Sequence, residues 1–198
     1  MNKKIVVLML VLGMFVSAQA TNALWNGSFD VNSANPDGWW TYLADSDNQA
    51  ITIEAGSLST YAAHISTASE SSAQLGQSVS ASAGDVVVVS GAYDGTYWGG
   101  AGITVAYYDS SWNYLGYAWA TLYSGTGEDT GWVTFSFTTG DGEGTWTAPA
   151  DTAYVTLKIE QWGWAETSFD EMSVSVPEPA TMIMLGLGGL ALIRRKVA

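Results

Sequence analysis

The feature that most constrains the fold of this chain is a hydrophobic pattern that repeats every second residue. Apolar and polar side chains alternate in residues 51–54, 103–107, 133–138 and 153–160. Such alternation is typical of a β-strand with one buried face. Residues 86–89 are four valines in a row, which predicts a strand buried on both faces or at the centre of a sheet. No stretch of comparable length has the period of 3.6 that an amphipathic helix requires, so we expect an all-β fold.

Clusters of Gly, Asp, Asn and Ser separate these segments and predict the turns between strands. Such residues supply positive φ angles or side-chain hydrogen bonds to the backbone. Spacings of about 8–12 residues then predict eight to ten short strands, arranged as a β-sandwich or barrel. The turn signals are residues 35–38, 83–85, 94–95, 125–129 and 141–144.

The first twenty residues have the three parts of a secretory signal peptide. Lys3 and Lys4 form a charged start, residues 5–16 an apolar run, and Ala18-Gln19-Ala20 a small-residue cleavage site. Such a leader is removed on export and takes no part in the fold. We therefore expect the Sec machinery as a partner, residues 1–20 as signal peptide, and one β-domain over residues 21–176.

The C-terminal tail combines a polar motif, an apolar run and a basic end. As a helix, residues 180–193 would be only about 21 Å long, whereas a hydrocarbon core is about 30 Å thick. The tail, residues 177–198, resembles the PEP-CTERM sorting signal. This resemblance implies exosortase as a partner, a transmembrane-like helix in the apolar run that anchors the protein transiently, and delivery to the cell surface or extracellular matrix. The motif residues are Pro177, Glu178, Pro179, Arg194, Arg195 and Lys196.

The charge of the β-domain limits the partners it can have. Between residues 21 and 176 the only basic residue is Lys158, against eighteen acidic residues, which gives a net charge of −17. Nucleic acid needs clustered Lys and Arg and is therefore excluded. Anionic lipids would repel this domain, so membrane contact falls to the tail. Neutral polymers and cations remain as candidate partners. Because the chain has no cysteine, the domain depends on its core or on metal ions for stability.

Five motifs in order give the domain a second resemblance. They are Asn-Gly-Ser-Phe-Asp at residues 26–30, Pro-Asp-Gly-Trp at 36–39, and the segments 75–85, 131–137 and 168–174. Together they resemble the jelly-roll carbohydrate-binding modules of the galactose-binding-like class. The resemblance implies a jelly-roll β-sandwich that binds carbohydrate without catalysis, in exopolysaccharide or in the matrix around the cell.

The same resemblance implies a structural calcium ion where the two ends of the domain meet. Its ligands would be the carboxylates of Asp30 and Asp170 with the backbone carbonyl of Ser28. Members of the class usually carry Glu at the position of Asp30 and Asp at that of Glu171, so this chain departs from the pattern at both. The alternative is that Asp30 and Asp170 are solvated acids at strand ends.

Aromatic residues are the main candidates for ligand binding. The domain holds 24 of them, more than a core of this size needs. Sugar rings pack their C–H faces on flat aromatic side chains while amides and carboxylates bind the hydroxyls. Several rings lie near glycines, where we expect exposed turns. Trp25, Trp132 and Trp146 are instead candidates for the buried core. The candidates are Trp98, Trp112, Tyr117, Trp119, Trp162 and Trp164.

The sequence offers little for catalysis. Its only histidine, His64, lies in a predicted strand and is expected to be structural. A carboxylate pair of the glycoside hydrolase type is the one remaining possibility, and eighteen acids make chance pairs common. We therefore predict a protein that is not an enzyme. The alternative to carbohydrate binding is a structural matrix or biofilm protein whose aromatic rings serve packing and self-association.

Overall fold

The computed structural model describes residues 22–30, 36–56, 58–128, 131–139, 143–144 and 147–176. These residues form one antiparallel sheet and no helix, which confirms the all-β prediction. The predicted signal peptide and sorting tail lie outside this part of the chain. Within it, nothing has the length and apolar character of a membrane-crossing helix.

The sheet has eight strands, and three of them are 20 or more residues long. Its order is β1-β3-β8-β4-β5-β7, with β2 also paired to β3 and β6 to β4. The strands are β1 (Trp40–Leu43), β2 (Gln49–Ala55), β3 (Tyr61–Ser80), β4 (Val88–Tyr108), β5 (Tyr114–Glu128), β6 (Val133–Thr138), β7 (Glu143–Gly144) and β8 (Tyr154–Ser175).

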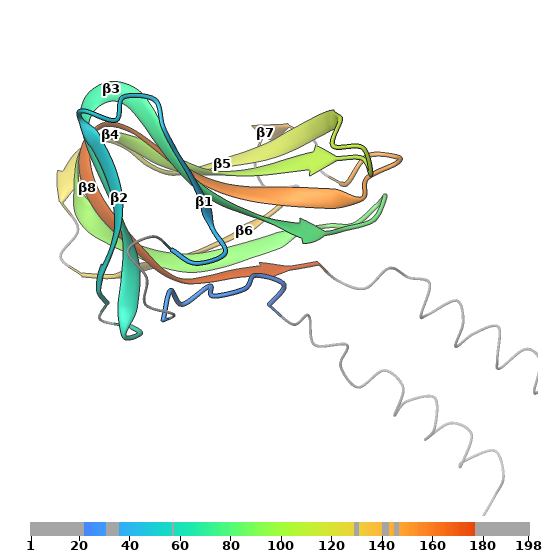
Figure 1. Ribbon diagram of the computed structural model, residues 1–198, viewed down its shortest axis with the longest axis horizontal. Coiled ribbons are helices and arrows are strands. Elements are labelled where there is room, and N and C mark those ends of the chain that lie inside the picture. The colour runs from blue at the N-terminus through green and yellow to red at the C-terminus, as the bar shows by residue number, and fades with distance from the viewer. Residues whose placement is uncertain are drawn as a thin grey trace, which may run out of the picture.

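The sheet curls over on itself and makes two layers (Figure 1). The long strands β3, β4 and β8 run through both layers and change neighbours on the way. In the first layer β3 pairs with β1, and β4 with β5; in the second layer β3 pairs with β2, and β4 with β6. The predicted sandwich is thus built from one folded sheet whose inner faces enclose the core.

The bend lies where glycines let neighbouring strands approach closely. Gly99 of β4 faces Gly163 of β8, and a Cβ atom on Gly99 would lie 2.1 Å from the carbonyl oxygen of Trp162. Gly163 has φ +81°, a conformation that side chains disfavour. At the bend, the pairing of β3 with β8 shifts its register between Ser69 and Ser72. The pairing therefore continues through the bend instead of ending there.

This continuity corrects two predictions. Short strands were expected, but β3, β4, β5 and β8 each run 15–22 residues because the bend is made within strands. Residues 125–129 and 94–95 were expected to form turns, yet residues 125–128 lie inside β5 and Gly95 lies inside β4. A Cβ atom there would sit 2.3 Å from the carbonyl oxygen of Glu166 on β8, so this glycine provides close strand approach.

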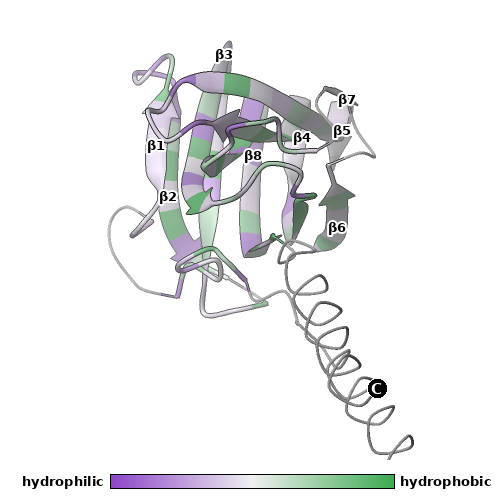
Figure 2. Ribbon diagram, turned by 90° about the vertical axis from the view of Figure 1, so that its right-hand side faces the viewer, coloured by the Kyte–Doolittle hydropathy of each residue, from purple (hydrophilic) through white to green (hydrophobic). Residues whose placement is uncertain are grey.

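The core follows the alternation seen in the sequence, which Figure 2 shows as stripes along the strands. Ile103, Val105 and Tyr107 of β4 are buried. The four valines were predicted to form a strand that is buried on both faces or lies at the centre of a sheet, and the second alternative holds for Val88 and Val89, which begin β4 between β6 and β8. Burial on both faces does not occur. Val87 and Val89 are fully buried whereas Val86 is exposed, because only one face of this segment turns toward the core.

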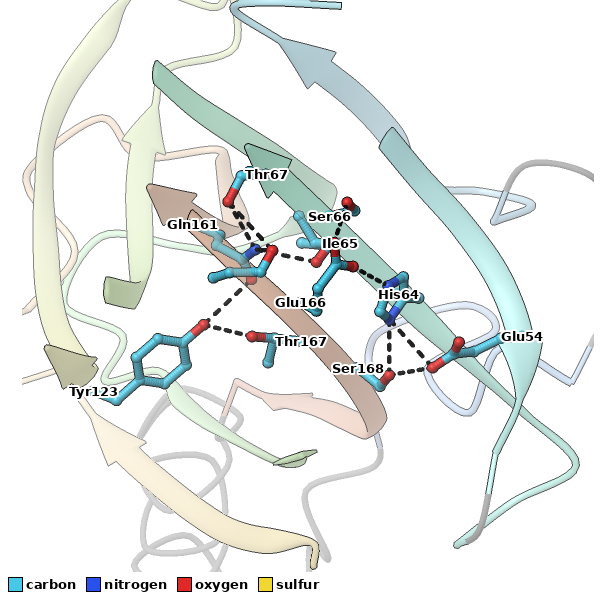
Figure 3. A network of polar contacts seen from close by, with 11 residues as sticks. Glu54, His64, Ile65, Ser66, Thr67, Tyr123, Gln161, Glu166, Thr167 and Ser168 are labelled. Carbon is cyan, nitrogen blue, oxygen red and sulfur yellow. Dashed lines mark hydrogen bonds and ion pairs between the residues drawn. The ribbon is translucent and has the colours of Figure 1, made fainter. Parts of the chain in front are cut away.

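A buried amide joins the two layers on the inner side of the bend (Figure 3). The Nε2 atom of Gln161 lies 3.0 Å from the carbonyl oxygen of Ile65, 3.1 Å from that of Ala165 and 3.2 Å from the hydroxyl of Thr67. The hydroxyl of Tyr123 donates to the Gln161 Oε1 atom at 3.3 Å. Because a buried amide is costly unless it is hydrogen-bonded, this network favours the curled arrangement.

Candidate functional site

The outer side of the first layer is covered with aromatic rings. In the first layer, core residues such as Ile103 and Val105 of β4 and Leu157 and Ile159 of β8 occupy odd positions, so the side chains at even positions point away from the core. Neighbouring strands continue this side through direct partners such as Trp40 and Gly76, or Trp119 and Thr104. We call it the outer aromatic face, formed by Trp40, Tyr42, Trp98, Tyr108, Trp112, Tyr114, Tyr117, Trp119, Tyr154, Trp162 and Trp164.

Some of these rings rest directly on glycines of the next strand. A Cβ atom on Gly100 would lie 2.4 Å from the indole of Trp162, and one on Gly102 would lie 2.3 Å from that of Trp119. Any larger residue at these positions would displace the ring above it. The glycines therefore leave room for the two indoles to pack on the sheet. Each indole turns only one of its faces toward the glycine.

Four tryptophans gather where the face meets the bend. The rings of Trp98 and Trp164 are 5.6 Å apart, and those of Trp119 and Trp162 are 5.8 Å apart. Trp98 is 67% exposed and Trp164 47%. An open hollow of about 560 Å³ lies here, lined by Trp98, Trp162 and Trp164 together with Glu70 and the 124–126 segment. We call these four tryptophans the bend cluster.

A second group of rings lies at the opposite end of the face, by the turn between β4 and β5. Trp112 stacks on Tyr154 with ring centroids 4.5 Å apart and planes at 1°, and Tyr108 lies 5.7 Å from Trp112. Tyr114 is 6.0 Å from Tyr108. We call Tyr108, Trp112, Tyr114 and Tyr154 the turn cluster. Tyr117 of β5, which is 45% exposed, lies on the same face, paired with Ala106.

The backbone of Trp112 is held in an uncommon conformation by Asp109. Trp112 has φ +63°. The Asp109 carboxylate accepts hydrogen bonds from the backbone of Ser111 at 2.8 Å, the backbone of Asn113 at 2.9 Å and the Asn113 side chain at 2.8 Å. The bonds from Asn113 lead the effects that lower the pKa of Asp109, so its anionic form stabilises this turn.

Polar side chains occupy the face between the two clusters. Gln74 donates to Glu160 at 3.0 Å, and Ser78 lies 2.8 Å from Thr156. Lys158, the one basic residue of the domain, stands between Glu160 and Thr156 on this side of β8. The face thus offers both donors and acceptors for hydroxyl groups beside its rings.

The structure brings together four of the six ring residues predicted from the sequence and separates the other two. Trp98, Trp119, Trp162 and Trp164 form the bend cluster, whereas Trp112 and Tyr117 lie toward the turn cluster. The expectation that Trp98, Trp162 and Trp164 lie in turns is wrong. They lie within β4 and β8, and the glycines beside them make the bend.

The sequence prediction omitted several rings of the face. Tyr108, Tyr114 and Tyr154 were not selected. The alternation of residues 154–160 does place Tyr154 on the side opposite the core, so this ring could have been found. Trp25, considered for the core, is 55% exposed and lies outside the face, in the segment before β1.

The predicted calcium ligands lie together at the other end of β8, where the 22–30 segment meets the strand. Met172 donates its backbone N–H to the carbonyl of Gly27 at 2.8 Å. Asp170 is fully buried and accepts bonds from the backbone N–H of Ser59 at 3.0 Å and of Glu171 at 2.7 Å. Asp30 is exposed and accepts the backbone N–H of Thr60 at 3.0 Å.

One hydroxyl at this corner lies within bonding distance of three oxygen acceptors. The Ser59 hydroxyl lies 2.9 Å from the Ser28 carbonyl, 2.7 Å from the Tyr61 carbonyl and 2.7 Å from an Asp170 carboxylate oxygen. One hydroxyl proton serves only one of these acceptors at a time. Burial, with smaller effects from the Asp170 and Asp30 charges, raises the pKa of Glu171. Carboxylate, carbonyl and hydroxyl oxygens are the ligand types that a hard cation such as Ca²⁺ takes.

Across the described part of the chain, no three Asp, Glu, His or Cys side chains converge as a ready metal site. The corner instead combines two carboxylates with backbone carbonyls and one hydroxyl.

His64 is held between two carboxylates on the outer side of the second layer (Figure 3). Its Nε2 atom lies 2.8 Å from Glu166 and its Nδ1 atom 3.3 Å from Glu54, with the Ser168 hydroxyl 3.1 Å away. Ser66 also donates to Glu166 at 2.8 Å. These contacts join β2, β3 and β8, which agrees with the structural role expected for His64.

Comparison with known proteins supports the interpretation of the tail and of the fold. Residues 175–196 match the PEP-CTERM protein-sorting motif, which indicates that the chain is exported and processed at its C-terminus. No curated protein matches the sequence.

Among solved structures, the xylan-binding domain CBM22-1 of Paenibacillus barcinonensis Xyn10C matches with a TM-score of 0.54 and 16% identity, over 78% of this chain and 94% of that domain. The module TmCBM61 in complex with β-1,4-galactotriose matches with a TM-score of 0.50 and 17% identity, over 79% and 99%. At these identities the likeness concerns the fold alone, and it confirms the jelly-roll β-sandwich.

A third match is the enzymatically active domain of tailspike protein 4 of bacteriophage CBA120. Its TM-score is 0.63 at 10% identity, and 78% of this chain is covered. This chain spans about a fifth of that protein, since the match covers 21% of it. The same fold therefore occurs both in separate binding modules and as a part of larger enzymes.

Proposed function

We propose that this exported protein binds uncharged glycans without catalysis, through its outer aromatic face, in the exopolysaccharide or matrix around the cell. The observation that carries the proposal is the bend cluster. Four tryptophans line or adjoin an open hollow, and glycines fix two of them to the sheet. Contiguous exposed apolar surface of this kind is typical of binding sites, and sugar rings pack well on aromatic surfaces.

The charge of the domain supports a neutral ligand. A net charge of −17 repels polyanions, and the hydroxyl groups of a neutral sugar can bind the polar residues beside the rings. A non-catalytic role fits the position of Glu171. Its raised pKa would suit a general acid, but it lies with Asp30 and Asp170, away from the aromatic face.

Affinity gel electrophoresis across a panel of neutral polysaccharides tests this proposal. We expect at least one polymer to retard the mature domain, and Trp98→Ala or Trp164→Ala to abolish most of that retardation with an unchanged melting temperature. Trp25→Ala is the matched control, because its ring is comparably exposed but lies outside the face.

If no neutral polysaccharide retards the protein, the proposal is wrong. Concentration-dependent self-association that is lost in the same Trp98 and Trp164 variants would instead favour the structural matrix role.

We also propose that Asp30, Asp170 and the Ser28 carbonyl hold a structural Ca²⁺ ion, with the Tyr61 carbonyl beside them. When bound, the ion would join the 22–30 segment to β8. A cation that binds only the folded state raises the melting temperature by mass action. We expect a higher melting temperature in calcium than in chelator, and no such difference in Asp170→Asn. Equal melting curves for the unmodified protein would exclude the ion.

For the tail, we propose cleavage by an exosortase near Pro177, Glu178 and Pro179, after a stage in which residues 180–193 hold the protein at the membrane. The mature protein should then lack Arg194, Arg195 and Lys196. Mass spectrometry of the protein recovered from the cell surface measures this directly, and an intact C-terminus would contradict it.

A further inference from the structure

The first residues of the β-domain are hydrogen-bonded to the last residues of β8, beside which they lie in Figure 1. The backbone N–H of Ala23 donates to the carbonyl oxygen of Val174 at 2.8 Å, and that of Met172 donates to the carbonyl of Gly27 at 2.8 Å. The earlier residue of one segment meets the later residue of the other, so the two segments run antiparallel. We call the arrangement the terminal clasp, formed by residues 22–27 and 172–174.

The side chain of Asn22 closes the clasp. Its Nδ2 atom donates to the carbonyl oxygen of Met172 at 3.0 Å, and its Oδ1 atom accepts the backbone N–H groups of Leu24 and Val174, both at 3.0 Å. Leu24, Met172 and Val174 are buried. A Cβ atom on Gly27 would lie 2.0 Å from the Met172 carbonyl oxygen, so the two segments are in close contact. The clasp therefore holds the chain from the first residue that the structure describes.

The two processing signals of the chain flank this clasp. The predicted leader ends at Ala20, two residues before Asn22. At the other end, the match to the sorting motif begins at Ser175, which is the last residue of β8 and pairs with Val88 of β4. Because the segments of the clasp run antiparallel, the predicted leader and the sorting tail are attached to the domain at the same corner.

Removal of the leader requires access to the chain on both sides of the bond that is cut. Hydrolysis breaks the peptide bond between Ala20 and Thr21, consumes one water molecule, and leaves a carboxyl group on Ala20 and an amino group on Thr21. Proteins that bind extended peptides do so through main-chain hydrogen bonds. In the closed clasp the N–H of Ala23 and the side chain of Asn22 are already bonded to β8. The peptidase and β8 therefore compete for the same residues.

From this arrangement we infer that the terminal clasp sets the order of maturation. The leader is removed only while the clasp is open, and closing of the clasp ends this step. A chain that closes the clasp with its leader attached keeps that leader, even after the sorting tail has been removed. Signal peptidase must therefore act before the domain completes its fold. The inference concerns maturation and is independent of carbohydrate binding.

Cleavage of the full-length chain by purified signal peptidase, in detergent and chelator, tests the inference. The chelator removes any contribution of the proposed calcium ion, which would lie at the same corner. One sample is folded beforehand, and the other is diluted from urea directly into the peptidase. We expect the folded sample to be cut at least about tenfold more slowly, because its cleavage follows the population of open clasps. Mass spectrometry identifies the cut after Ala20.

Asn22→Ala opens the clasp selectively. The change removes three hydrogen bonds, so the folded variant should be cut about tenfold faster than the folded unmodified chain. The rate of each variant diluted from urea corrects for the altered sequence beside the bond that is cut. Asn48→Ala is the matched control, because it removes an exposed bond to Asp45 in the loop between β1 and β2 and should leave the rate unchanged.

Gln161→Leu distinguishes opening of the clasp from unfolding of the whole domain. It weakens the bend, away from the clasp, and should accelerate cleavage less than Asn22→Ala even if it lowers the melting temperature more. Equal rates for the folded and unfolded samples, or a folded Gln161→Leu chain that is cut as fast as Asn22→Ala, would overturn the inference. If the unfolded chain is not cut after Ala20, the predicted leader is wrong and the inference fails with it. The proposed carbohydrate binding stands in each of these cases.

Discussion

The two layers share three strands, yet their outer sides differ completely. The first layer presents the outer aromatic face, where rings rest on glycines. The second layer presents polar side chains, with His64 held between Glu54 and Glu166. Because β3, β4 and β8 run through both layers, the difference comes from the side chains at outward positions and from the neighbouring strands on either side of the bend.

The comparison shows which parts of the molecule serve stability and which serve another purpose. Hydrogen-bonded polar groups on a solvent-exposed sheet face need no further explanation. Eleven aromatic side chains on the opposite layer do, since they cover little core and leave large apolar surfaces in water. The largest effects on stability should arise inside the bend, and the largest effects on binding on the aromatic face.

The first test of this difference between the layers is to remove the hydrogen-bonded amide that links them. Gln161→Leu takes away a fully buried amide that lies within bonding distance of two carbonyl oxygens and the Thr67 hydroxyl. We expect a loss of about 3 kcal/mol in the free energy of unfolding, because each unsatisfied buried acceptor costs about 1–3 kcal/mol. Urea unfolding measures it. Tyr123→Phe, which removes one donor to the same amide, should cost less.

If Gln161→Leu leaves the midpoint of unfolding unchanged, the amide does not stabilise the bend. Loss of carbohydrate binding together with stability would show that the two layers unfold as one unit.

A second change separates the aromatic face from the core. Gly100→Val places side-chain atoms where the Trp162 indole lies, since even a Cβ atom would be 2.4 Å from that ring. We expect carbohydrate affinity to fall about tenfold, an effect of about 1.4 kcal/mol, as the ring is displaced. A double variant with Trp162→Ala should be no weaker than Trp162→Ala alone, because both changes remove the same contact. Additive losses would contradict this explanation.

A third change concerns the polar layer. His64→Ala removes the contacts to Glu54 and Glu166, which lie at the surface. Exposed pairs contribute about 0–1 kcal/mol, so we expect a decrease in stability within that range and unchanged carbohydrate affinity. Thermal melting and affinity electrophoresis measure the two quantities. A binding defect in this variant would show that the polar layer also contacts the ligand.

The smallest expected effect is that of Glu171, at the end of the second layer. Its pKa in the folded protein is raised above the ordinary value of 4.5 by burial and then by Asp170 and Asp30. As the pH rises from 4.5, the unfolded chain loses this proton first, so stability falls until the folded state has also lost it. In chelator, Glu171→Gln should therefore be slightly more stable than the unmodified protein at pH 7, by about 0.5 kcal/mol or less.

At pH 4 the difference between the Glu171 variant and the unmodified protein should vanish, because the carboxyl group is then protonated in both states. Melting temperatures across this range provide the measurement. A variant that is less stable than the unmodified protein at pH 7 in chelator would contradict the cause assigned to the raised pKa.

The sequence by itself determined the class of fold and the separation of buried from exposed positions. A period of two leaves only β-strands, and in residues 153–160 it assigned Val155, Leu157 and Ile159 to the core, where the structure has them. The order of the motifs also predicted the jelly-roll architecture, and the three-part tail predicted the sorting motif at residues 175–196. These features are local, because each depends on residues adjacent in the chain.

Only the tertiary structure decided what the glycines do and which rings meet. From the sequence alone, turns are expected at Gly95, Gly99 and Gly163. A local pattern does not distinguish a glycine that reverses the chain from one that lets a neighbouring strand approach closely. Long strands, the bend, and the division of the rings into two clusters all depend on contacts between segments 40 or more residues apart, as with Trp98 and Trp164 or Trp112 and Tyr154. Such contacts depend on register across the sheet, which the sequence of any one strand does not contain.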